Sequence, residues 1–216
     1  GKSDPKYFGY PGARSRFLKF FPNGFHSEGY AAQERDYKLA AKNKLDATAP
    51  LEMAITGSGF GEAILSVYRA TNMLSPFEKT RLQDVFRGPS SDAVIRAAAE
   101  FTENADKNSL GRLEAALKPH DCAKWTVVTY LPYLWRPDRH MFLKPEVTKD
   151  FAARVGHPFA SNYEARLKID VYASLLDLVE RTSRELSDLQ PRDRIDIQSF
   201  IWVVGDYQED RDGTYT

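Results

Sequence analysis

The stretch Lys124-Trp125-Thr126-Val127-Val128-Thr129-Tyr130-Leu131 decides whether this chain is wholly helical or carries a β element. Its β-branched and aromatic side chains favour a strand by propensity. However, Trp125, Val128 and Leu131 are spaced three residues apart and also fit one face of a helix. Periodicity alone does not separate the two structures in so short an apolar run. We therefore expect at most a short β element near residues 125–143.

The sequence on both sides of this stretch is typical of helices. Ser75-Pro76-Phe77-Glu78 has a capping serine, a proline in the first turn and a glutamate at the capping-box position, which together predict a helix start. A longer helix is expected over residues 163–189, where apolar side chains recur every three or four residues. The predicted fold class is mainly α: a compact multi-helix domain with at most the short β element near residues 125–143.

The chain divides into four segments by composition. Residues 1–29 are rich in Gly, Pro and aromatic side chains, so we expect an irregular arm that packs its rings on the body of the protein. Residues 30–120 are expected to form one helical subdomain, and residues 121–208 a second one that contains a Pro- and aromatic-rich segment. Residues 209–216 are predicted to form an acidic, solvated tail. Nothing resembles a flexible linker, so the two subdomains are expected to pack tightly.

The overall composition is that of a globular protein. The chain has 216 residues, 42% of them hydrophobic and 28% charged, and 30 Lys and Arg balance 30 Asp and Glu. No global charge therefore attracts it to nucleic acid or to a membrane surface. The longest purely apolar run, residues 200–204, is too short to cross a bilayer, which predicts no membrane partner. The single cysteine, Cys122, fits a reducing compartment, so a cytoplasmic location is expected.

Charge is distributed unevenly along the chain. Residues 1–44 hold nine Lys and Arg against four Asp and Glu, whereas residues 177–216 hold five Arg against ten acidic residues. Two interpretations follow from this polarity. Either the two ends pack together, or the basic end binds a polyanion.

The basic end itself is a candidate nucleic-acid-binding arm. Arg14, Arg16 and Lys19 alternate with Phe17 and Phe20, a composition that suits contact with a phosphate backbone. Equally, the phenylalanines fix the arm to the core while the basic side chains stay in water.

The glycine-rich segment Gly57-Ser58-Gly59-Phe60-Gly61 is a candidate phosphate-binding loop, because glycines let backbone amides approach a phosphate. It lacks the preceding strand and the alternating β–α pattern of a dinucleotide-binding loop. We therefore interpret it as a turn between helices.

The best candidate patch for ligand binding is a basic segment beside aromatic side chains. Its members are Arg136, Asp138, Arg139, His140 and Lys144. Arginine side chains bind phosphate or carboxylate groups, and exposed rings stack on bases. The alternative is a loop whose arginines pair with aspartate and whose rings fill the core.

Asp193 and Asp196 form the remaining candidate cluster. Two carboxylates three residues apart are able to hold Mg²⁺ together with water. The favoured alternative is that Asp193 pairs with a nearby arginine. The four histidines are scattered and show no zinc-ligand spacing. We therefore predict no metal and no cofactor.

These observations favour a non-catalytic binding or adaptor module, associated with nucleic acid and part of a larger bacterial assembly. Its ligand-binding residues are expected to be Arg136, Arg139, His140, Lys144, Arg14, Arg16 and Lys19. The first alternative is an enzyme for a phosphate-containing substrate, with His140 as general acid–base group. Asp138, Asp193 and Asp196 would complete its site. The second alternative is a protein–protein scaffold, so the expected partner is nucleic acid or protein.

Overall fold

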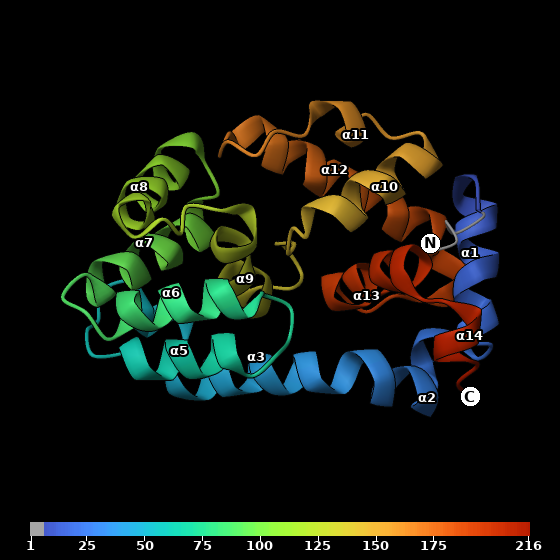
Figure 1. Cartoon of the computed structure of the whole chain (residues 1–216), viewed down its shortest axis with the longest axis horizontal. Helices are drawn as coiled ribbons and strands as arrows, with labels where there is room; N and C mark the ends of the chain where they lie inside the picture. Colours follow the sequence, from blue (N-terminus) through green and yellow to red (C-terminus); the bar gives the residue numbers. More distant parts are fainter. Residues whose placement is uncertain (1–6) are drawn as a thin grey trace. The chain divides into compact units, whose positions relative to one another are not determined.

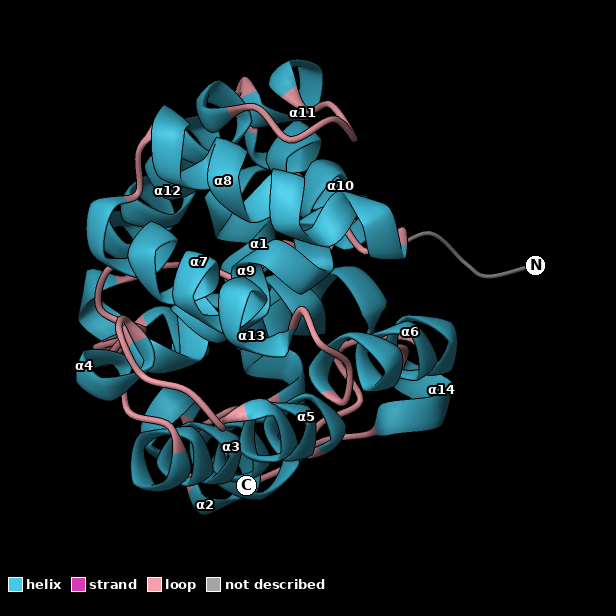
Figure 2. Cartoon of the chain, turned by 90° about the vertical axis from the view of Figure 1, so that its left-hand side faces the viewer, coloured by secondary structure: helices cyan, strands magenta, loops and turns pink. Residues whose placement is uncertain are grey.

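Helices account for all regular secondary structure in the computed structural model, which describes residues 7–216 (Figure 2). Residues 125–131 of the ambiguous stretch belong to one of these helices, α9, which runs from Trp125 to Trp135. The predicted mainly α, multi-helix fold is confirmed, and the described residues contain no β element near positions 125–143. Every helix in this range is too short or too polar to span a lipid bilayer.

Burial explains why α9 is a helix despite its strand-like composition. Every residue of α9 except Thr126 is buried, and a helix that is apolar on all sides is stable in a protein interior. Two of its polar side chains form hydrogen bonds there: Tyr130 OH donates to the Val67 carbonyl at 2.9 Å, and Thr129 Oγ1 donates to the Trp125 carbonyl at 2.6 Å. Packing on all sides therefore outweighs the β propensity of the valines and threonines.

The described chain forms two compact units. Unit 1 comprises residues 7–36, 144–163 and 171–216, and unit 2 comprises residues 37–143 and 164–170. The boundary predicted near residue 120 falls inside unit 2.

Unit 2 is built around one helix, α7 (Ser91–Asn104). It packs against α4 (Leu51–Ala54), α5 (Gly61–Arg69), α6 (Pro76–Phe86), α8 (Lys107–Leu117) and α9 (Figure 1). The unit also contains nearly all of α3 (Asp36–Thr48) and the short 3₁₀ turn η3 (Lys118–His120). One helix thus serves as the common packing surface for five others.

Local signals fix two of the connections in unit 2. Ser75 Oγ accepts the N–H of Glu78 at 3.2 Å, and Glu78 Oε1 accepts the N–H of Ser75 at 3.0 Å, which confirms the predicted start of α6. The glycine-rich segment, residues 57–61, connects α4 to α5, as expected for a turn between helices. Gly61, the first residue of α5, lies so close to Phe86 that a Cβ would be 2.1 Å from the Phe86 carbonyl oxygen. Only glycine fits this position.

Unit 1 is centred on α13 (Arg194–Asp206). This helix packs against α1 (Gly9–Phe20), α10 (Pro145–Val155) and the π-helical turn η2 (Ala31–Arg35) (Figure 1). The other elements are η1 (Gly24–His26), α2 (Glu28–Tyr30), α11 (Phe159–Asn162), α12 (Ile169–Glu185), η4 (Ser187–Leu189) and α14 (Glu209–Asp212). The first two residues of α12 belong to unit 2.

The expectation of an irregular arm is wrong for most of its described part, and residues 1–6 of that segment lie outside the described residues. Residues 9–20 form the regular helix α1, whose buried residues Tyr10, Ala13 and Phe17 recur at helical spacing. The glycines and Pro11 concealed this pattern, because proline is tolerated in the first turn of a helix. The aromatic rings of the described arm are buried except that of Phe8, and the Phe17 ring centroid lies 5.2 Å from that of Phe200 on α13.

Candidate functional site

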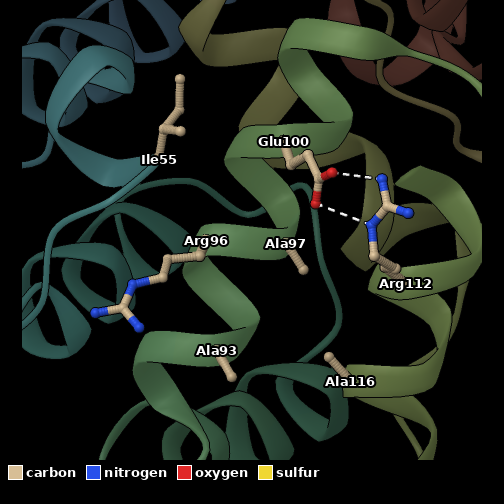
Figure 3. A pocket seen from close by; sticks show the side chains of 7 residues that line it. All are labelled: Ile55, Ala93, Arg96, Ala97, Glu100, Arg112 and Ala116. Atoms are coloured by element: carbon tan, nitrogen blue, oxygen red, sulfur yellow. Dashed lines mark hydrogen bonds and ion pairs between the residues drawn. The ribbon is translucent and has the colours of Figure 1, made fainter. Parts of the chain in front are cut away.

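Small side chains leave a hollow on the surface of unit 2, between α7 and α8. Ala93 and Ala97 lie one turn apart on α7, and Ala116 faces them from α8 (Figure 3). The hollow has a volume of about 490 Å³. It is lined by Ile55, Ala93, Arg96, Ala97, Glu100, Arg112 and Ala116.

The sequence of α7 produces this hollow. Val94, Ile95 and Phe101 are buried on the inner side of the helix, so Ala93 and Ala97 lie on the outer side at the spacing of one turn. Their methyl groups are too short to fill the space between the surfaces of the two helices. The result is an apolar floor that is open to solvent.

Two arginines and one glutamate border this floor. Arg112 Nε donates to Glu100 Oε2 at 3.0 Å, and Arg112 Nη2 donates to the other oxygen of the same carboxylate (Figure 3). These hydrogen bonds raise the pKa of Arg112 above its usual range. Among the lining side chains, the Glu100 carboxylate is matched by Arg112, so Arg96 contributes a positive charge that no lining carboxylate balances.

Arg96 is held by one edge only. Its Nε donates to the carbonyl oxygen of Gly57 at 2.8 Å. Neither Nη atom of Arg96 has a hydrogen-bond partner within residues 7–216. The side chain leaves α7 on the flank opposite Arg112 (Figure 3). Two N–H-bearing nitrogens at the edge of the hollow therefore remain available.

The glycine-rich turn fixes the oxygen that holds Arg96. The N–H of Gly59 donates to Asp92 Oδ1 on α7 at 2.9 Å, and the N–H of Gly57 donates to the Met53 carbonyl at 2.8 Å. A Cβ at Gly57 would lie 2.5 Å from that carbonyl oxygen. The amides of Gly57 and Gly59 are thus bound inside the protein, and the turn supports the hollow.

The predicted basic patch is divided between the units. Its members Arg136, Asp138, Arg139 and His140 belong to unit 2, whereas Lys144 belongs to unit 1, where it directly precedes α10.

In unit 2 the patch residues bind the carboxyl ends of helices. Arg136 Nη1 donates to the Trp135 carbonyl at 2.9 Å at the end of α9, and Arg139 Nη2 donates to the Glu103 carbonyl at 3.2 Å at the end of α7. The last carbonyls of a helix lack partners within it, so basic side chains commonly bind them. Asp138 is exposed.

His140 is buried rather than solvent-facing. Its side chain has 1% exposure, and Nε2 lies 2.7 Å from the carbonyl oxygen of Thr102. A carbonyl oxygen only accepts, so Nε2 carries the proton in this contact. The ring also packs against Phe101, with centroids 6.0 Å apart. The imidazole thus binds a carbonyl group near the carboxyl end of α7. Its predicted acid–base role remains a prediction.

The basic residues of the predicted arm bind acceptors within unit 1. Arg14 forms an ion pair with Asp188, and Lys19 forms one with Glu209. Arg16 Nε donates to the Val204 carbonyl at 3.0 Å, at the carboxyl end of α13. Of the two interpretations of the charge polarity, these contacts support packing of the two ends on each other.

Asp193 caps the start of α13. Its Oδ1 accepts the N–H groups of Ile195 at 3.0 Å and Asp196 at 3.2 Å. Both of its carboxylate oxygens also accept from Arg35, each at 2.9 Å. The predicted pairing of Asp193 with an arginine is therefore present.

Asp196 is fully buried and surrounded by donors. Its carboxylate accepts from Tyr30 OH at 2.6 Å, from Arg35 Nη1 at 3.0 Å and from the backbone N–H of Arg192 at 2.9 Å. Burial, followed by the adjacent Asp196 charge, raises the pKa of Tyr30 well above its usual value. Within residues 7–216 no group of three or more His, Cys, Asp or Glu is arranged to hold a metal ion.

Sequence reasoning did not identify the hollow. Arg96 has no aromatic or basic neighbour in the sequence, and alanines spaced four residues apart are ordinary in helices. Only the meeting of Ala93 and Ala97 with Ala116 from the next helix creates the site. No protein family model, curated protein or solved structure matches this chain. The function of the hollow is therefore inferred from its own residues.

Proposed function

We propose that this protein is a binding module for a partner protein, and that a short segment of the partner lies in the hollow between α7 and α8. The observation that carries this proposal is the alanine floor bordered by Arg96 and by the Glu100–Arg112 pair. Alanine side chains allow a partner's backbone or small side chains to approach the helices closely. The charged border then selects among the segments that fit.

The size and openness of the hollow support a peptide segment as the occupant. Its volume of about 490 Å³ lies within the range of about 300–1,000 Å³ typical of ligand sites. It is a surface trough and not an enclosed chamber, which suits a chain that enters and leaves. Peptide segments commonly bind in grooves between helices.

The lining favours binding over chemistry. Its polar side chains are two arginines and one glutamate, and it contains no serine, cysteine or histidine to act as nucleophile or proton carrier. It also suits protein better than nucleic acid, because one excess positive charge is small for a phosphate backbone that several cations normally contact.

A display experiment tests this proposal. Short random peptides are selected on the whole chain and then measured on Ala97→Trp, whose indole fills the hollow. The matched control is Ala115→Trp, at an exposed alanine on α8 that does not line the hollow. We expect peptides that bind the wild type and the control but lose at least about tenfold affinity for Ala97→Trp. Thermal unfolding of both variants checks that they are folded.

Two results would overturn the proposal. One is a set of selected peptides that binds Ala97→Trp as tightly as it binds Ala115→Trp. The other is the absence of any selected peptide together with salt-dependent binding of labelled DNA or RNA, which would favour the predicted nucleic-acid role.

A further inference from the structure

We infer that the segment bound in the hollow carries a carboxylate side chain and that Arg96 receives it. This inference rests on the proposed function and adds the chemical class of the ligand. Within residues 7–216, Arg96 is the polar lining residue with both Nη atoms unoccupied, whereas Glu100 and Arg112 bind each other.

The geometry of Arg96 suits a carboxylate. Guanidinium presents two parallel N–H groups that match the two oxygens of a carboxylate. One edge of the group, at Nε, is already bound to Gly57, so the Nη1 and Nη2 edge is left for a ligand. A lysine at this position would offer a point charge without this two-pronged match.

The turn beneath Arg96 prepares the group for binding. Gly57 is held through its N–H on Met53, and the same turn is bound to α7 through Gly59 and Asp92. The carbonyl that orients Arg96 therefore has a defined position before a ligand arrives. Because less side-chain freedom is lost on binding, such prior ordering strengthens affinity.

The charge of the lining favours an anionic group. Two arginines against one glutamate leave one positive charge, which one carboxylate balances. An acidic residue next to small apolar side chains, which fit over Ala93 and Ala97, is therefore the expected ligand sequence.

Two display libraries test this inference. One contains all amino acids and the other lacks Asp and Glu, and peptides from both are measured on the wild type, Arg96→Gln and Arg96→Lys. Peptides that contain Asp or Glu should dominate the first library. They should bind about tenfold more weakly to Arg96→Gln and to an intermediate extent to Arg96→Lys. Arg69→Gln, at an arginine of unit 2 that does not line the hollow, is the matched control.

The outcomes separate this inference from the proposed function. If the neutral library yields peptides of equal affinity that Ala97→Trp still excludes, the hollow binds protein but the carboxylate inference is wrong. Acidic peptides that bind Arg96→Gln as tightly as wild type also overturn it. If Ala97→Trp weakens no peptide from either library, both the proposed function and this inference fail.

Discussion

At the scale of single residues, most side chains that resemble a binding patch in the sequence form hydrogen bonds or ion pairs with other groups of the same protein. Arg16 binds the end of α13, Arg136 the end of α9, and Arg139 and His140 the end of α7. Exposed helix carbonyls attract the same donors that a phosphate would attract. A basic residue beside aromatics therefore has two explanations in a sequence, and only its acceptor distinguishes them.

Asp196 is expected to be the most sensitive charged residue of unit 1. Asp196→Ala removes a fully buried carboxylate and leaves the guanidinium of Arg35 and the hydroxyl of Tyr30 short of a partner. We expect a loss of about 3 to 5 kcal/mol in the free energy of unfolding, measured by urea titration. Asp210→Ala, at an exposed position on α14, is the control. A loss below about 1 kcal/mol at Asp196 would contradict its place in the network.

Buried tyrosines make the protein sensitive to alkali. Burial raises the pKa of Tyr30 and of Tyr207 above the ordinary value of 10.0. The folded state therefore holds these protons more tightly than the unfolded state, so their contribution to stability is complete below pH 10 and is lost as pH rises above it.

This linkage predicts a specific difference between variants. Between about pH 9 and about pH 11, the wild type should lose more unfolding free energy than Tyr30→Phe, whose ring does not ionise. Urea titrations at the two pH values measure both losses. Equal losses in the two proteins would show that Tyr30 titrates alike in the folded and unfolded states.

At the scale of elements, the sequence predicts helices best where a local signal is complete. The capping box at Ser75 gives the start of α6 correctly. Helix α9 is ambiguous because its helical form depends on burial on all sides, which is a property of the neighbouring helices. Helix α1 is missed because glycine and proline near its start resemble turn residues, although Pro11 is in the first turn.

Two glycine substitutions test the packing of helices in unit 2. In Gly61→Ala the new Cβ would meet the Phe86 carbonyl oxygen at 2.1 Å, so we expect a loss of about 1 to 3 kcal/mol in the free energy of unfolding. Gly111 lies within α8 and has no atom within 4 Å of an added Cβ. Gly111→Ala should therefore stabilise the protein by about 0.5 to 1 kcal/mol.

Chemical denaturation of Gly61→Ala and Gly111→Ala measures the change in the free energy of unfolding for each variant. Opposite signs are expected, because the same added methyl group clashes in one case and only improves helix propensity in the other. A neutral Gly61→Ala would mean that α5 and the end of α6 separate easily.

At the scale of the whole molecule, equal numbers of opposite charges conceal an uneven distribution along the chain. In unit 1 the basic residues near one end of the chain contact acidic residues near the other, as in Arg14 with Asp188 and Lys19 with Glu209. The sequence shows the imbalance but not which cation meets which anion. For the same reason it does not reveal the hollow of unit 2, which needs alanines from two helices.

These contacts predict how the basic end of the chain affects the affinity for nucleic acid. Because Arg14 and Lys19 are paired within unit 1, the double variant Arg14→Ala, Lys19→Ala should leave the affinity for labelled DNA and RNA oligonucleotides unchanged. Fluorescence anisotropy over a salt series measures this affinity. Strong binding that weakens steeply with salt and disappears in the double variant would instead identify the basic end as a nucleic-acid interface.

The most direct test of the central claim is the affinity of peptides selected on the wild type, compared between Ala97→Trp and Ala115→Trp. The two variants add the same side chain to alanines on adjacent helices of unit 2, one lining the hollow and one outside it. If the hollow between α7 and α8 is the binding site, Ala115→Trp keeps wild-type affinity and Ala97→Trp loses at least about tenfold. Equal affinities for the two variants would contradict the claim.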